Sequence, residues 1–456
     1  MFDAVVRRGS IVSAQETRPG DIAIKDGKIV AVLAPGTPVV AEHEYDATGC
    51  YVLPGAVDVH VHSRAPARPD RETWESATQA AARGGITTIV EMPTSDPAAS
   101  TPAVLRNRVR TALQSAHVDF ALYAGGVTGS ARAAAELAAE GIVGFKILSH
   151  SPPPNREREF VGLCAVSNAQ LYESLQAIAG TGLPCAVHAE DESLLEQGVE
   201  RTRAGGTGHP LEHARSRPPY VEAVSIATLL ILTEETGARL HLPHVSSAWG
   251  LRLALEGKSK GVDVSVETCP HYLCFDESKL AELGGFAKVN PPLRLAADRE
   301  ALWEGIRTGG VDNVASDHGP YLYEEKDKES IWEAQAGNPG LEAVASVVYD
   351  AAVRGGITFN QAAAVLAENP AERFGLSRKG RLAPGFDADL VIFDPDQKWT
   401  FDWRDAYSLV RRNYKMYQGR EFHGKLRAVL SRGTLVYDGR KVVGSAGHGR
   451  YVTPGD

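Results

Sequence analysis

The spacing of apolar residues divides the chain into two regions of different texture. At both ends, in residues 1–50 and 381–456, apolar and polar positions alternate in short runs separated by turn residues. Alternation with a period of two is typical of strands with one buried face, and the Asp-Gly pair at 26–27 is a strong hairpin signal. We therefore expect the two ends to form one small β-sandwich domain, with residues 51–380 inserted between them.

The middle of the chain alternates apolar β runs with segments of helical periodicity. The β runs are YVLPGAVDVHVH, GITTIVEMP, VDFALYAGG, GIVGFKIL, LPCAVHAE, ARLHLPHVSS, VDVSVETCPHY and VDNVASDH. The helical segments between them often end in glycine, as helix C-termini commonly do. Eight strands alternating with helices predict an α/β fold of the parallel (β/α)8 TIM-barrel type rather than an open doubly wound sheet.

Composition and charge exclude several classes of function. Of the 456 residues, 43% are hydrophobic and 23% are charged, and the net charge is -9. A negative chain without a cluster of Lys and Arg argues against binding to nucleic acid or to an anionic membrane. No stretch has the length of a transmembrane helix, and the start lacks a signal peptide's apolar centre, so we expect a cytoplasmic protein. The five cysteines lack metal-binding spacing and are expected to be reduced.

Side chains of the kinds that bind metals follow the carboxyl ends of the predicted strands, where (β/α)8 enzymes carry their active sites. These residues are His60, His62, Lys146, His188, His244 and Asp317. Any one of them alone would more often have an ordinary structural role. Their common position at one barrel mouth predicts a site for a divalent metal, because imidazole and carboxylate groups are good ligands for such ions.

Lys146 needs a separate explanation, because an ammonium group repels a cation. Burial within the apolar run VGFKIL would favour the neutral amine. A neutral amine can add carbon dioxide to form a carbamate, an anion whose two oxygens can bridge two metal ions.

The chain carries the motifs DVHVH, GFK, VHAE, HVSS, ETCPHY, KVNPPLR, SDHGP, GNPGLE and GRLAPGFDADLVIFD. As a set, these motifs resemble those of the cyclic amidohydrolases, the group of allantoinases, hydantoinases with dihydropyrimidinases, and dihydroorotases. The resemblance covers nearly the whole chain. It implies a hydrolase that opens a cyclic amide bond, with a barrel, a terminal β-domain and assembly into a homotetramer or homodimer.

The resemblance also implies two divalent metal ions per chain, usually zinc, with manganese as an alternative, bridged by carboxylated Lys146. One ion would be held by His60, His62, Lys146 and Asp317, and the other by Lys146, His188 and His244. In the implied reaction a metal-held hydroxide attacks the ring carbonyl, and Asp317 acts as general base and then as general acid. Backbone groups around Thr268, Asn290 and Asn338 are implied to bind the amide edge of the ring.

Several ring substrates remain open. Arg64 in HVHSR occupies a position where dihydroorotases bind the substrate carboxylate, but Thr94 and Tyr321 stand where that pattern has asparagine and histidine. The segments VDFALYAGGV, VHAEDE and AGNPGLE resemble hydantoinases, whereas CPHY and NPPLR also suit allantoinases. We expect a ureide hydrolase of hydantoinase or allantoinase type. Dihydroorotase, another cyclic imide or lactam hydrolase, and a non-catalytic relative are the alternatives.

The segment 150–167 combines three consecutive prolines with a run of charges directly after the fourth predicted strand. Such a stiff segment at this position is suited to covering the barrel mouth and bounding the pocket for a ring substituent. A surface insertion without substrate contact is the alternative.

Overall fold

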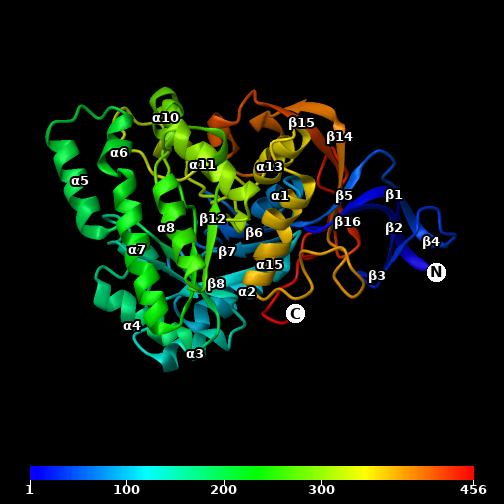
Figure 1. Ribbon diagram of the computed structural model, residues 1–456, viewed down its shortest axis with the longest axis horizontal. Helices are drawn as coiled ribbons and strands as arrows, with labels where there is room; N and C mark the ends of the chain where they lie inside the picture. Colours follow the sequence, from blue (N-terminus) through cyan, green and yellow to red (C-terminus); the bar gives the residue numbers. More distant parts are fainter.

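A computed structural model describes residues 1–456 as a barrel with a smaller sheet at its side (Figure 1). The barrel contains eight parallel strands, in chain order around the ring: β6 (Ala56–Val61), β7 (Ile86–Glu91), β8 (Asp119–Gly125), β9 (Gly144–Leu148), β10 (Pro184–His188), β11 (Arg239–Leu242), β12 (Val264–Thr268) and β13 (Asn313–Val314). A parallel bridge between Val61 and His318 joins the last strand to the first. The predicted eight-stranded barrel is therefore confirmed.

Helices cover the outside of the barrel and connect its strands. The connecting helices are α1 (Trp74–Arg83), α2 (Pro102–Ser115), α3 (Ala131–Ala138), α4 (Asn168–Ala179), α5 (Glu192–Ala204), α6 (Leu211–Ser216), α7 (Pro219–Thr236), α8 (Ala248–Ser259), α9 (Pro270–Cys274), α10 (Glu277–Leu283), α11 (Ala296–Arg307), α12 (Tyr323–Lys326) and α13 (Val344–Val353). Several begin at a Ser or Thr whose side chain accepts an N–H of the first turn, as Thr73 does for α1 and Ser247 for α8. No helix combines the length and the apolar character needed to cross a bilayer.

Short helical segments complete this part of the chain. They are η1 (Glu157–Phe160), η2 (Gly284–Ala287), α14 (Phe359–Ala363), η3 (Ala364–Glu368), α15 (Asn369–Arg373), η4 (Trp403–Asp405) and η5 (Arg411–Met416). Of these segments, η1 lies in the loop after β9, on the side of the barrel mouth.

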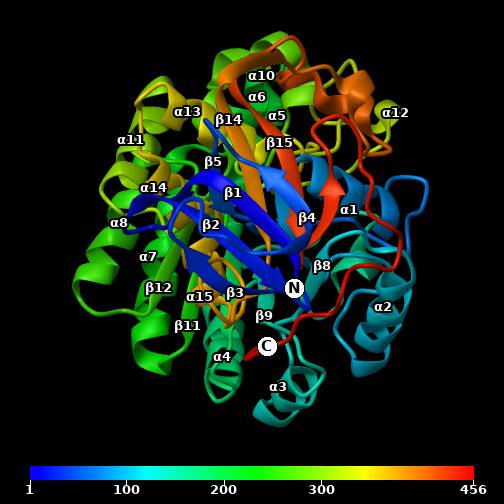
Figure 2. The same cartoon turned by 90° about the vertical axis from the view of Figure 1, so that its right-hand side faces the viewer.

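The smaller sheet is built from both ends of the chain (Figure 2). Its strands are β1 (Phe2–Val12), β2 (Thr17–Lys25), β3 (Lys28–Leu33), β4 (Ala41–Asp46), β5 (Tyr51–Pro54), β14 (Leu390–Thr400), β15 (Glu421–Ser431) and β16 (Thr434–Tyr437). The order is β16-β15-β14-β5-β1-β2-β3, with β4 beside β1. Val6, Ile22, Leu390 and Leu430 belong to one buried core, so the two ends depend on each other for burial.

The predicted first barrel strand, residues 51–62, forms two strands in the structure. β5 pairs with β1 and β14 in the smaller sheet, and β6 pairs with β7 in the barrel. Gly55 lies between them, where an added Cβ would be 2.2 Å from the Thr87 Oγ1 atom. The chain therefore passes from the smaller sheet into the barrel at Gly55, where the backbone is too close to Thr87 to leave room for a side chain.

The C-terminal tail returns to the barrel. The Phe120 N–H donates to the Arg450 carbonyl at 2.9 Å, and the Arg450 N–H donates to the Asp119 Oδ1 atom at 2.8 Å. Beside this contact the buried Lys379 ammonium lies 2.5 Å from Asp119 and 2.7 Å from Asp389. Since Asp119 begins β8, the tail and the small sheet are attached at the amino ends of the barrel strands, away from the predicted site.

Candidate active site

The structure places all six predicted metal ligands at the carboxyl ends of the barrel strands. His60 lies in β6 and His62 directly follows it, Lys146 lies in β9, His188 ends β10, and His244 and Asp317 follow β11 and β13. Their side chains are buried, except that His62 and Asp317 keep exposed fractions of 15% and 13%. These two residues therefore mark the side of the site that is open toward solvent.

The first group of ligand atoms is formed by His60, His62 and Asp317. One atom of each lies within 4.8 Å of the others. The Asp317 Oδ1 atom is 3.2 Å from the His60 Nε2 atom and 3.8 Å from the His62 Nε2 atom. Two imidazoles and a carboxylate facing a common point are a donor set that suits zinc and related divalent ions.

The second group is formed by His188 and His244. The His188 Nδ1 atom lies 3.0 Å from the His244 Nε2 atom, and the His244 ring is 5.2 Å from the His60 ring, measured between centroids. Burial lowers the pKa of His188 to about 3 and that of His244 well below its usual value. Both rings are therefore neutral at physiological pH, which is the form that binds metals.

Lys146 lies between these groups on β9, paired with Ala186 of β10. Burial lowers the pKa of the Lys146 ammonium to about 8, although Glu267 and Asp317 act in the opposite direction. Its side chain forms no ion pair or hydrogen bond within the protein. A minority of the amine is therefore neutral near pH 7, far more than for a lysine with its usual pKa, and carbamate formation requires this neutral form.

Glu267, the penultimate residue of β12, orients the first group, and the sequence analysis did not identify it. The His60 Nδ1–H donates to the Glu267 Oε1 atom at 2.7 Å, and the His244 backbone N–H donates to the same oxygen at 3.0 Å. Burial alone would raise the pKa of Glu267, but His60 and His241 lower it well below its usual value. An ionised Glu267 therefore fixes the His60 ring with Nε2 toward Asp317.

Glu190 plays the corresponding part for His188. It accepts a hydrogen bond from the His188 Nε2–H at 2.9 Å and is paired with Arg217. Arg217 and His188 hold the pKa of Glu190 well below its usual value despite complete burial. His188 therefore presents Nδ1 to the site. The signal was present in the sequence, because Glu190 follows His188 by two residues in the VHAE motif.

Three residues at this mouth have positive φ angles, a backbone conformation that residues other than glycine rarely adopt. The φ angles of Arg64, His244 and Asp317 are 58°, 42° and 46°. Positive φ values at non-glycine residues cost free energy and persist where the surrounding contacts impose them. Their concentration here indicates that this end of the barrel is built for function rather than for stability alone.

The four predicted substrate-binding residues have different surroundings. The Thr268 hydroxyl donates to the Val245 carbonyl at 2.9 Å, so its side chain is already used. The Oδ1 atoms of Asn290 and Asn338 are buried and have no partner in the protein. Arg64 is 4% exposed and donates to Glu159 and Tyr321. The two asparagines are therefore the residues with free acceptors for the N–H groups of a ring.

The segment 150–167 lies over the barrel mouth. Phe160 and Leu163 are buried against Ala98 and Leu148, and Arg156 donates to the Tyr321 hydroxyl at 2.9 Å. The segment, which forms the loop after β9, thus contacts the loop after β13.

Cys269 also lies near the site, with His271 and Asp317 within 4.8 Å. Burial raises the pKa of its thiol well above the usual value, so it is not the thiolate that would bind a metal. All five cysteines are free.

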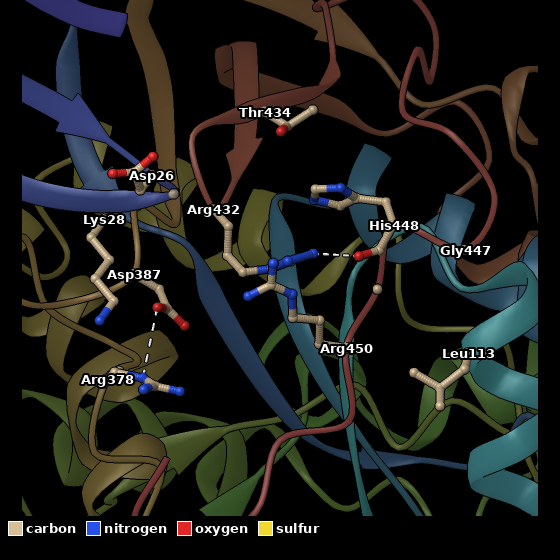
Figure 3. Close-up of a pocket in the computed structure, with 12 residues that line it drawn as sticks. Asp26, Lys28, Leu113, Arg378, Asp387, Arg432, Thr434, Gly447, His448 and Arg450 are labelled. Carbon is tan, nitrogen blue, oxygen red and sulfur yellow. Dashed lines mark hydrogen bonds and ion pairs between the residues drawn. The ribbon is translucent and has the colours of Figure 1, made fainter. Parts of the chain in front are cut away.

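A large cavity of about 710 Å³ lies elsewhere, between the smaller sheet and the C-terminal tail (Figure 3). Arg432, His448 and Arg450 line one side, and Lys28 and Arg378 line the other. Since Arg432 pairs with Asp119 at the start of β8, this cavity is at the amino ends of the strands. It contains none of the predicted site residues and is not the catalytic pocket.

Comparison with known proteins agrees with this geometry. Residues 51–436 match the amidohydrolase family. The chain is 36% identical to an allantoinase of Rubrobacter xylanophilus, over 99% of this chain and 98% of that protein. It is 34% identical to an L-hydantoinase of Paenarthrobacter aurescens, with the same coverage. The solved structure of an L-hydantoinase (dihydropyrimidinase) from Arthrobacter aurescens superimposes with a TM-score of 0.95, at 34% identity, covering 99% of this chain and 100% of that one.

Proposed function

The chain belongs to the amidohydrolase family, and we propose that it is a metal-dependent hydrolase that opens the ring of a cyclic ureide of the hydantoin or allantoin type. The observation that carries this proposal is the pair of ligand groups at one barrel mouth, His60 with His62 and Asp317, and His188 with His244. The relatives named allantoinase and L-hydantoinase each align with 99% of this chain, which supports the class of substrate.

The residues present fit two divalent ions, which we take to be zinc, with manganese as the alternative. Carboxylated Lys146 would supply the bridging oxygens, and the neutral imidazoles and Asp317 would complete the two sets. Bound there, the ions would polarise the ring carbonyl and lower the pKa of water. The unpaired state of buried Lys146 and the orientation of both histidine groups by Glu267 and Glu190 support this assignment.

Asp317 would carry the proton during hydrolysis. Burial raises the pKa of its carboxyl group to about 6 in the absence of a metal ion, and a positioned carboxylate is a suitable proton acceptor and donor. Asp317 would accept the proton of the attacking water as oxygen bonds to the ring carbonyl carbon. It would return that proton to the ring nitrogen as the carbon–nitrogen bond breaks, which leaves a carboxylic acid and a ureido N–H group. The acid then releases the second proton of the water to solvent and becomes a carboxylate.

Asn290 and Asn338 would hold the ring during this step. Their unpartnered Oδ1 atoms can accept hydrogen bonds from ring N–H groups. A site with unpaired buried acceptors discriminates strongly against rings that lack the matching N–H.

The test is a ring-opening assay on metal-loaded enzyme with allantoin, a 5-substituted hydantoin, dihydrouracil and dihydroorotate side by side. Opening of allantoin or the hydantoin with two bound metals per chain is expected. Preference for dihydroorotate would overturn the ureide assignment. Absence of both metal and activity would support the non-catalytic alternative.

We also propose that the protein is a cytoplasmic homodimer or homotetramer. The outer faces of the adjoining helices α7 and α8 and the start of α11 expose Ile231, Trp249 and Leu295, at 68%, 45% and 58%. Exposed apolar side chains of this size are common at interfaces between copies of a chain. Light scattering of wild-type protein and of Ile231→Glu tests this, because a monomeric wild type would contradict it.

A further inference from the structure

Three guanidinium groups surround the ring of Tyr321 at the barrel mouth. The Cζ atoms of Arg64, Arg71 and Arg156 lie 5.4, 4.6 and 5.5 Å from the ring centroid. Arg64 and Arg71 belong to the loop after β6, Arg156 to the loop after β9, and Tyr321 to the loop after β13. The cluster is therefore assembled from the same face of the barrel as the predicted metal ligands, and Arg64 follows His62 by two residues.

Glu159 lies between two of these groups. Its Oε2 atom accepts from the Arg64 Nη1–H at 2.8 Å and from the Arg156 Nη2–H at 2.7 Å, and its Oε1 atom accepts from the Arg156 Nε–H at 3.0 Å. The Glu159 side chain is 15% exposed. A carboxylate with this arrangement of donors makes strong, charge-assisted hydrogen bonds.

The cluster retains donors that no protein group uses. The Nε atom of Arg64, itself 4% exposed, is buried without a partner, as are the Nε and Nη1 atoms of Arg71. Glu325 pairs with Arg71, so three guanidinium groups face two carboxylates. Within the cluster, Glu159 occupies the position between Arg64 and Arg156 at which an anion is held.

We propose that Glu159 is a specificity-determining residue that excludes ring substrates with an anionic substituent. It uses the guanidinium groups that a substrate carboxylate would need, and its own charge repels such a carboxylate in a buried site. Discrimination by a repelling charge is a general means of rejecting a competing ligand. This inference rests on the proposed function and deepens it, because it assigns the enzyme to rings with neutral substituents.

A purely structural role for Glu159 would have different consequences. If its contacts only anchored segment 150–167 to the barrel, replacing the carboxylate would weaken the binding of neutral and anionic rings alike. Glu159→Gln keeps the size and an acceptor oxygen but removes the charge. The ratio between the affinity for a neutral ring and the affinity for an anionic ring therefore distinguishes a role in specificity from a purely structural role.

The experiment uses metal-loaded full-length protein and two probes of matched size, hydantoin-5-acetate and its neutral amide. Titration calorimetry gives the dissociation constant of each probe, and kcat/KM is measured wherever a probe is opened. We expect wild-type protein to bind the amide at least tenfold more tightly than the carboxylate. Glu159→Gln should shift the ratio toward the carboxylate by at least tenfold, and Arg64→Met in the Glu159→Gln background should remove that gain.

Glu157→Gln is the matched control, because Glu157 lies in the same turn, is exposed and contacts the Asn155 backbone rather than Arg64. It should leave the ratio unchanged. Equal binding of both probes by wild-type protein, or an unchanged ratio in a folded Glu159→Gln protein, overturns the role of Glu159. Failure of wild-type enzyme to open the neutral amide and the other ureides counts instead against the proposed function.

Discussion

His60 and Glu267 join the first and seventh strands of the barrel through a hydrogen bond of 2.7 Å from Nδ1–H to Oε1. This contact determines which nitrogen of His60 faces Asp317. The orientation of a proposed metal ligand is thus fixed by Glu267, which is not among the proposed ligands.

Replacing Glu267 with glutamine should weaken metal binding by about 10- to 100-fold, because such outer hydrogen bonds orient and polarise their histidines. Competition with a chromogenic chelator measures the affinity. Glu196→Gln, at an exposed position on α5 without an ion pair, is the control. Unchanged affinity in the Glu267 variant would show that His60 is held by packing alone.

Replacing Lys146 with alanine should abolish binding of two metals per chain, because it removes the only group that we assign to both ions. Metal analysis of the purified variant and a ring-opening assay check this outcome. A variant with two bound metals and wild-type activity would refute the assignment of Lys146.

Lys326 should position Asn338. Its buried ammonium donates to the backbone carbonyls of Lys288, Gln335 and Gly337 at 3.1, 2.8 and 2.6 Å. Lys326→Met leaves these carbonyls unsatisfied, which we expect to destabilise the fold by about 3 kcal/mol and to raise KM more than it lowers kcat.

Thermal unfolding and steady-state kinetics provide both readouts for this change. The exposed neighbour Lys328→Met is the control. An increase in KM of similar size in the two variants would contradict the positioning role of Lys326.

Glu342 should make stability depend on pH. Burial raises the pKa of its carboxyl group to about 7, and its Oε2 atom has no partner. The folded state then holds a proton that the unfolded state releases from about pH 4.5 upward, so stability falls as the pH rises to about 7. The glutamine of Glu342→Gln cannot ionise. The free energy of unfolding of this variant, relative to that of wild type, should therefore increase by about 2 kcal/mol between pH 5.5 and 8.5.

Melting temperatures of wild type and Glu342→Gln at pH 5.5, 7 and 8.5 measure this difference, with Glu196→Gln as the control. A gap that stays constant over this range would show that Glu342 does not titrate there.

The barrel was predictable because eight buried apolar runs alternate with segments of helical periodicity along the chain. The division of residues 51–62 into β5 and β6 could not be predicted, because an apolar run does not reveal in which of two sheets it is buried. The placement of the ligands followed from strand position alone. The pairing of Arg64 with Glu159 could not be predicted from the sequence, because a contact between loops that are distant in sequence depends on how the loops fold over the barrel mouth.

The smaller sheet has a consequence for synthesis of the chain. Strands β1 to β5 leave the ribosome first, yet β5 obtains its neighbour β14 only after the whole barrel has been made. Until then the nascent protein carries an open strand edge, the kind of surface that recruits other unfinished chains. When many ribosomes translate one message at the same time, neighbouring nascent chains can therefore pair through this open edge. Slow elongation before β14 would prolong the time for which the edge of β5 is exposed.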